Sequence, residues 1–172
     1  MSMREILLPE FDQEMASTRR LLERVPEDRL GWTPHPKSFT LQALLSHVVN
    51  IPSWIPMVLE QEVLDMAPEG QEPRKTPQME SRSAWLSAFD ANVAAGRASL
   101  ERLEDARLAE TWTMKAGAEI LFSAPKGVVL RSFVLNHLIH HRAQLSVYLR
   151  MLDIPLPGIY GPSADEQMMS EG

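Results

Sequence analysis

The stretch from Pro125 to Leu152 constrains the fold of this chain more than any other part of its 172 residues. Apolar side chains recur along it at intervals of three or four, and after its first turn it contains no proline or glycine. This spacing predicts one long helix whose apolar face must be covered by other elements. Pro125 is suited to start the helix, because a first-turn residue needs no backbone donor. The apolar positions are Leu130, Val134, Leu138, Leu145, Tyr148 and Leu152.

Two further segments with helical spacing run from about Met3 to Val25 and from about Ser83 to Leu103. Pro26 ends the first of them, because proline cannot continue a helix. The second is rich in alanine beside its apolar face. Its small side chains permit another helix to approach closely.

The remaining helix begins at Leu41, for which Thr40 is a suitable N-cap. Its apolar stripe continues past Pro52 and Pro56, and each proline removes a backbone donor. We therefore expect a kink or a break there. Residues 66–78, with prolines and a glycine among charges, are predicted to form an exposed loop.

Helical spacing fails between Thr111 and Ser123, where two short runs flank Ala116-Gly117-Ala118 and predict a small hairpin. The chain is therefore expected to be an all-α four-helix bundle with a β-hairpin insertion before the last helix, in a single domain of residues 1–172. The expected core contains Leu7, Phe11, Leu44, Val48, Leu86, Phe89, Val93, Val134, Leu138 and Leu145.

Composition excludes several classes of function. The chain has no cysteine, so any metal must be held by nitrogen or oxygen. Its 17 Lys and Arg against 23 Asp and Glu give a net charge of -6, which disfavours nucleic-acid binding. The uncharged residues 38–59 are interrupted by polar side chains and prolines, so we expect no membrane span. The N-terminus has no secretory pattern, and a cytoplasmic location is expected.

Three of the five histidines lie close together on the last predicted helix. His137 and His141 are four residues apart and project into the apolar stripe, whereas His140 points about 120° away at ~100° per residue. Two imidazoles one turn apart can bind one divalent ion but need a third ligand. His47, on the rim of the stripe that begins at Leu41, is the first candidate. His35, between two prolines, is a weaker one.

Spacing alone leaves two interpretations open. A histidine such as His47 on an apolar face is often a hydrogen-bonded core residue. Two neighbouring buried imidazoles, however, would each lose hydration, and protonation of either would place like charges side by side. If a metal is bound, zinc, nickel, iron and manganese are all chemically allowed. Gln144 is the first candidate to support a ligand, whereas Arg142, at the edge of the stripe, suits a solvated or interfacial salt bridge.

The sequence resembles the DinB/YfiT-like four-helix bundles, which are DNA-damage-inducible-type bacterial proteins related to thiol-dependent transferases and isomerases. The matching residues cover nearly the whole chain and are His47 within Leu44-Leu45-Ser46-His47-Val48, His137-x-x-x-His141-Arg142-Ala143-Gln144, Trp32, Pro36-Lys37-Ser38 and Ile159-Tyr160-Gly161-Pro162. The resemblance implies that His47, His137 and His141 bind one divalent metal ion and that the protein is a homodimer.

Two functions are compatible with these features. The first is a metal-dependent enzyme of the thiol-transferase, isomerase or hydrolase kind that acts on a small molecule, with a low-molecular-weight thiol implied by the resemblance. No thiol-binding motif is identifiable, and Asp12, Glu14 and Asp90 cannot be placed as acids or bases from the sequence. The second is a noncatalytic stress-response protein that binds a metal or a small ligand.

The alanine-rich and uncharged helices also favour a homodimer, because they offer more packable surface than one core needs. The alternative is that the small residues let helices of one bundle approach closely.

Overall fold

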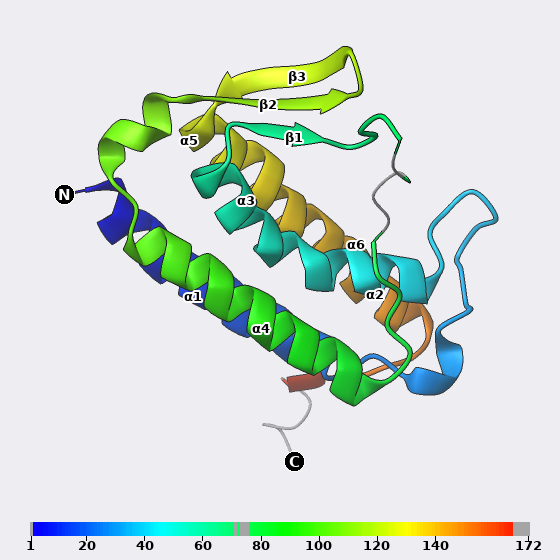
Figure 1. Ribbon diagram of the computed structural model, residues 1–172. Coiled ribbons are helices and arrows are strands. Elements are labelled where there is room, and N and C mark those ends of the chain that lie inside the picture. The colour runs from blue at the N-terminus through cyan, green and yellow to red at the C-terminus, as the bar shows by residue number, and fades with distance from the viewer. Residues whose placement is uncertain (1, 71, 73–75, 167–172) are drawn as a thin grey trace.

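The structure, a computed structural model, describes residues 2–70, 72 and 76–166. It is mostly helical. The long helices are α1 (Met3–Leu22), α2 (Leu41–Asn50), α4 (Arg82–Glu101) and α6 (Asn136–Met151). Helix α1 packs along α4, and α2 packs against both α4 and α6 (Figure 1). A small three-stranded sheet lies to one side of the helices, beside the short helices α3 (Trp54–Glu60) and α5 (Lys126–Val128).

Helix α1 begins with a capping box. The Ser2 hydroxyl accepts from the backbone N–H of Glu5, and the Glu5 carboxylate accepts from the backbone N–H of Ser2. These bonds satisfy two backbone donors that have no partner within the helix. The helix ends at Leu22, three residues before the predicted Val25, although Val25 itself is buried as expected.

The break expected at the two prolines is confirmed. Thr40 caps α2 by accepting from the backbone N–H of Ala43. After α2 the chain forms a 3-10 turn, η2 (Ile51–Ser53), and then the short helix α3 (Trp54–Glu60). None of the helices in the described part of the chain is long and apolar enough to cross a bilayer.

The prediction of an all-α fold is incomplete, because the sheet has three strands. Strands β2 (Thr111–Ala116) and β3 (Glu119–Pro125) pair antiparallel, joined through Gly117 at φ 61°. Strand β1 (Val63–Asp65) pairs parallel with β2 and was not predicted. A strand of three residues is too short to show an alternating pattern, and its hydrogen bonds come from a strand distant in sequence.

The chain between β1 and α4 is the predicted loop. Of residues 66–78, residues 71 and 73–75 lie outside the described residues. The described remainder contains no helix or strand. Shorter connections elsewhere include the 3-10 turns η1 (Glu27–Arg29) and η3 (Asp105–Ala109).

The last predicted helix is continuous but not uniform. It starts after Pro125 with α5 (Lys126–Val128), widens into the π-helix η4 (Val129–Leu135), and continues as α6. π-helical turns are rare and often lie next to functional sites. The apolar spacing of residues 129–135 does not distinguish this π-helix from an ordinary α-helix.

The core is largely as expected, since eight of the ten predicted core residues are buried. The exceptions are Leu86 and Val93, which are only partly buried. The inward face of α4 is instead centred on Trp85, Phe89 and Gly96, which places the two exceptions at its edge.

Two contacts fix this face of α4. The indole N–H of Trp85 donates to the Leu22 carbonyl at 3.1 Å, so the buried ring also has its polar atom satisfied. At Gly96 an added Cβ would lie 3.0 Å from the Pro52 carbonyl oxygen. The missing side chain therefore lets α4 approach η2 closely.

Candidate metal centre

His47, from α2, meets His137 and His141, from α6, where these two helices pack together. The Nε2 atoms of His47 and His137 are 2.9 Å apart. The ring centroids of His47 and His141 are 4.5 Å apart, and those of His137 and His141 are 4.6 Å apart. One nitrogen from each ring lies within 4.8 Å of the other two. The structure thus brings together the three histidines that the sequence singled out.

The orientation of His141 is set by Gln144, one turn further along α6. The Nδ1 atom of His141 and the Oε1 atom of Gln144 are 2.7 Å apart. An amide oxygen can only accept, so Nδ1 carries the proton and Nε2 keeps its lone pair. This contact agrees with the prediction that Gln144 supports a ligand.

Burial keeps these imidazoles neutral. It is the main reason that the pKa of His47 falls from 6.5 to about 4, and the neighbouring His141 and His137 lower it further. The pKa of His137 also falls to about 4, through burial and then through His141 and His140. Burial lowers the pKa of His141 as well, against the effect of Gln144. At neutral pH the cluster therefore presents unprotonated nitrogens.

This donor set fits a divalent metal ion. Neutral imidazole is a ligand that zinc, nickel and iron all accept. Within the described part of the chain, the group that could hold a metal comprises these three histidines and no carboxylate. Three protein ligands leave coordination positions open, which is typical of catalytic rather than structural sites.

Aromatic side chains wall the cluster. The ring of Trp54 is 5.5 Å from His47 and 5.3 Å from His137, and it stacks on Phe133 at 5.2 Å. Phe39 lies 6.3 Å from the rings of His47 and His141. These three aromatic residues were not among the site residues expected from the sequence. The sequence spacing does indicate that two of them share a helix face with the histidines, since Trp54 follows His47 by seven residues and Phe133 precedes His137 by four.

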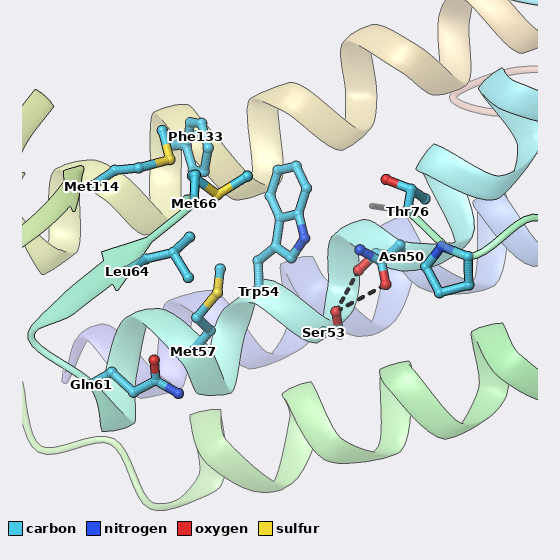
Figure 2. A pocket seen from close by; sticks show the side chains of 11 residues that line it. Asn50, Ser53, Trp54, Met57, Gln61, Leu64, Met66, Thr76, Met114 and Phe133 are labelled. Atoms are coloured by element: carbon cyan, nitrogen blue, oxygen red, sulfur yellow. Dashed lines mark hydrogen bonds between the residues drawn. The ribbon is translucent and has the colours of Figure 1, made fainter. Parts of the chain in front are cut away.

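A cavity of about 500 Å³ lies beside this aromatic wall, and Trp54 and Phe133 line it (Figure 2). Both side chains also contact His137. The cavity and the histidine cluster therefore share two side chains.

Comparison with known proteins identifies the family. A sequence model of the DinB family matches residues 1–170. The chain belongs to the DinB family.

Solved structures of DinB-like proteins have the same fold as this DinB-family chain. A DinB-like protein from Bacillus cereus ATCC 10987 is 24% identical with a TM-score of 0.65, and the match covers 89% of this chain and 95% of that one. The DinB-like protein YjoA from Bacillus subtilis is 18% identical with a TM-score of 0.67, and the match covers 91% of this chain and 98% of YjoA.

A shorter match adds a sequence relative. The uncharacterized protein YrdA of Bacillus subtilis (strain 168) is 43% identical over 42 residues. This match spans 24% of the DinB-family chain and 25% of YrdA.

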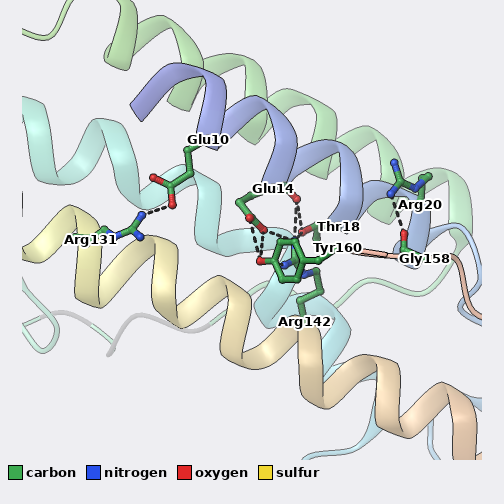
Figure 3. A network of polar contacts seen from close by, with 8 residues as sticks. All are labelled: Glu10, Glu14, Thr18, Arg20, Arg131, Arg142, Gly158 and Tyr160. Carbon is green, nitrogen blue, oxygen red and sulfur yellow. Dashed lines mark hydrogen bonds and ion pairs between the residues drawn. The ribbon is translucent and has the colours of Figure 1, made fainter. Parts of the chain in front are cut away.

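The residue after His141 corrects one expectation from the sequence. Arg142 was expected at a solvated or interfacial boundary, but only 3% of it is exposed. Its Nη1 atom lies 2.5 Å from the Glu14 carboxylate of α1, which is also buried (Figure 3). Arg142 does form a salt bridge, but the salt bridge is buried in the protein and not on its surface. The sequence could not show this, because the two residues are 128 positions apart.

Tyr160, which is itself largely exposed, adds a hydroxyl to the buried pair of Arg142 and Glu14. Its hydroxyl accepts from Arg142 at 2.7 Å and donates to Glu14 at 2.9 Å (Figure 3). Burial, followed by the bond to Glu14, raises the pKa of Tyr160, so the hydroxyl keeps the proton that it donates. The C-terminal segment is thereby attached to α1 and α6 just behind His141.

The acids that the sequence could not place are engaged in ion pairs. Asp12 pairs with Arg97 at 2.9 Å, and Asp90 pairs with Arg19 at 2.8 Å. Like Glu14, they are held by arginines rather than facing the histidines.

The other two histidines lie outside the cluster. His140 is exposed on α6, as its helical position predicted. The Nδ1 atom of the exposed His35 accepts from the backbone N–H of Lys37 at 3.1 Å, within a turn. Among the described residues, the group that could hold a metal includes neither of them.

Proposed function

We propose that this DinB-family protein is a metal-dependent enzyme that acts on a small molecule, with one divalent ion held by His47, His137 and His141. The single observation that carries this proposal is the convergence of three imidazole nitrogens within 4.8 Å beside a cavity. The proposal treats the long helices as a four-helix bundle, in which ligand sites lie between facing helices. The packing of α1 and α2 against both α4 and α6 supports that description.

A bound divalent ion would supply Lewis-acid chemistry, by lowering the pKa of a water or thiol or by polarising a carbonyl. The chain's own residues prepare the surroundings. Gln144 holds the His141 ring in one tautomer, and burial keeps the lone pairs of His47 and His137 free of protons. Trp54 and Phe133 place apolar rings against His137, on the side of the cluster where the cavity lies.

Within this class we propose thiol transfer to an electrophile as the first reaction to test, and hydrolysis or isomerisation as the next. The support for a thiol is the sequence resemblance to thiol-dependent transferases and isomerases. The support for turnover is the cavity, because a metal site with no room for a substrate would suit a noncatalytic binding protein.

Metal content tests the first half of the proposal. We expect about one equivalent of divalent metal in the untagged protein by elemental analysis. Each of the variants His47→Ala, His137→Ala and His141→Ala should lose most of it. His140→Ala is the matched control, because this exposed histidine is on the same helix, and it should retain the metal. Full metal content in all three ligand variants contradicts the assignment.

Turnover tests the second half. The metal-loaded protein is incubated with a panel of small thiols and an aromatic electrophile such as chlorodinitrobenzene, and separately with activated esters. We expect wild type and His140→Ala to accelerate at least one reaction and His137→Ala to lose that acceleration. If wild type is no faster than His137→Ala across the panel, the protein is a metal-binding protein without turnover.

A further inference from the structure

The cavity beside the histidines is built from several separate segments of the chain (Figure 2). Its lining comes from the end of α2, from η2 and α3, from β1 and β2, from the π-helix, and from the loop before α4. Its volume of about 500 Å³ is within the range of sites that enclose small organic ligands. A small molecule is therefore a suitable occupant.

One part of the cavity is apolar and rich in methionine. Met57 of α3, Met66 after β1 and Met114 of β2 line it together with Leu64 and Phe133. Figure 2 shows these side chains gathered on the side of Trp54 away from Asn50. Thioethers adapt their shape readily and make favourable contacts with aromatic rings. This part of the wall suits an aromatic or branched alkyl group.

The other part offers neutral hydrogen-bonding groups, from Asn50, Ser53 and Thr76, and Gln61 adds one amide at the edge of the apolar part, near Met57. The indole nitrogen of Trp54 faces this side (Figure 2). Among the residues that the structure describes, neither the indole N–H of Trp54 nor the amide nitrogen of Asn50 donates to another protein group. These donors are available to a ligand that carries an acceptor such as a carbonyl oxygen.

The charge of the lining is as informative as its shape. In the described part of the chain no Lys, Arg, Asp, Glu or His lines the cavity. A carboxylate or phosphate buried there would lose its hydration without gaining a counter-charge, which is costly. The described part of the lining therefore suits an uncharged ligand.

The position of the cavity connects it with the metal centre. Asn50 is one turn beyond His47 on α2, and Trp54 and Phe133 each contact both the cavity and His137. From these observations we propose that the cavity is the site for an uncharged, largely apolar substrate with an aromatic or branched alkyl body and a carbonyl acceptor. It would hold the electrophile, with any thiol reaching the metal centre from elsewhere. This inference rests on the proposed function.

Prodan, a neutral naphthalene ketone whose emission reports the polarity and hydrogen bonding of its surroundings, is the probe. We expect saturable binding to wild type and weakening by at least about tenfold in Met57→Lys and Met114→Lys, because each places a charge in the apolar part. Met3→Lys is the matched control on an exposed methionine and should bind like wild type. Thermal unfolding followed by circular dichroism selects variants that remain folded.

Two further measurements test the chemistry of the site. Asn50→Leu removes a donor and should shift the emission of bound prodan to the blue. Anilinonaphthalene sulfonate, which adds a negative charge to a similar ring system, should bind wild type at least about tenfold more weakly than prodan. Equal binding of prodan by wild type and both folded lysine variants overturns the proposal. So does tighter binding of the sulfonate, or an unchanged emission in Asn50→Leu.

The titration is repeated on chelator-treated and on zinc-loaded protein, which separates this inference from the proposed function. Prodan binding that responds to the variants as expected, in a protein that takes up no metal, supports the cavity and contradicts the metal-dependent function. Metal uptake lost in the ligand variants, in a protein that binds no prodan, supports the metal centre and overturns the cavity inference.

Discussion

The Nε2 atom of His47 lies 2.9 Å from the Nε2 atom of His137, although 90 positions separate the two residues in the sequence. Two neutral imidazoles in this position have one hydrogen bond available between them at most, and only if one of them carries its proton on Nε2. With both protons on Nδ1, two lone pairs would face each other. A cation between the rings would turn that repulsion into attraction, which is the physical reason for testing metal binding first.

Stability should depend on pH in the metal-free protein. The pKa values of His47 and His137 fall from 6.5 to about 4 on folding, so between these values the unfolded chain binds more protons than the folded one. The free energy of unfolding therefore increases as pH rises through this window. The stabilisation is lost progressively as pH falls from 6.5 toward 4. Urea denaturation of chelator-treated protein at pH 5 and pH 7 measures the difference.

The double variant His47→Gln with His137→Gln is the control for this prediction, because glutamine does not titrate. Its stability should change less between the two pH values than that of wild type. An equal change in both proteins would show that other groups cause the dependence.

Gln144 should tune metal affinity. Gln144→Leu removes the acceptor for the Nδ1 proton of His141, and loss of such a partner weakens metal binding by about 10 to 100-fold. Gln144→Glu keeps an acceptor and should retain affinity. Competition with a chromophoric chelator measures both variants, and an unchanged zinc affinity in Gln144→Leu would contradict the assigned role.

The buried pair of Arg142 and Glu14 should matter for stability. Arg142→Met leaves the Glu14 carboxylate buried without its counter-charge, which costs about 3–5 kcal/mol in the free energy of unfolding. Tyr160→Phe removes one hydroxyl from a largely exposed side chain and should cost less, about 0.5–1.5 kcal/mol, because Arg142 and Glu14 still pair with each other. Urea denaturation at pH 7 measures both.

Arg29 provides the matched comparison, because its contact with Asp28 is 3.6 Å long and fully on the surface, with 61% and 79% of the side chains exposed. Arg29→Met should change stability by less than about 0.5 kcal/mol. If Arg142→Met is no less stable than Arg29→Met, the buried pair does not support the fold.

We propose a homodimer that forms through α4. Ala84, Ala91, Ala94 and Ala95 are exposed on this helix, at spacings that place them on one face. Light scattering at micromolar concentration should give twice the mass of one chain, and the double variant Ala91→Arg with Ala95→Arg should give the mass of one. A single-chain mass for wild type would contradict the dimer.

The pair His137 and His141 was predictable because its information is local, whereas the full set with His47 was implied by the family resemblance. His137 and His141 are one turn apart on a strongly periodic helix. Thr40, as a suitable N-cap, indicates where the helix that carries His47 begins. Helical spacing then fixes the side that each ring faces. The structure adds the distance between the two helices.

What could not be predicted depends on contacts between distant segments. Glu14 meets Arg142 only once α1 lies against α6, and β1 exists only because β2 is there to pair with it. The π-helix could not be predicted for a different reason: its sequence has the same apolar spacing as an ordinary helix. Trp85 is buried and Leu86 only partly buried because the two residues flank Phe89 on the helix, and helical spacing alone does not show which of them faces the core.

The methionines that line the cavity and the three clustered histidines come from different parts of the chain. The histidines sit on α2 and α6, whereas Met57, Met66 and Met114 sit on α3, after β1 and on β2. Substitutions in the latter segments can reshape the cavity without moving a ligand nitrogen. The fold is therefore modular in an evolutionary sense: the segments that carry the histidines can stay constant while those that carry the methionines change.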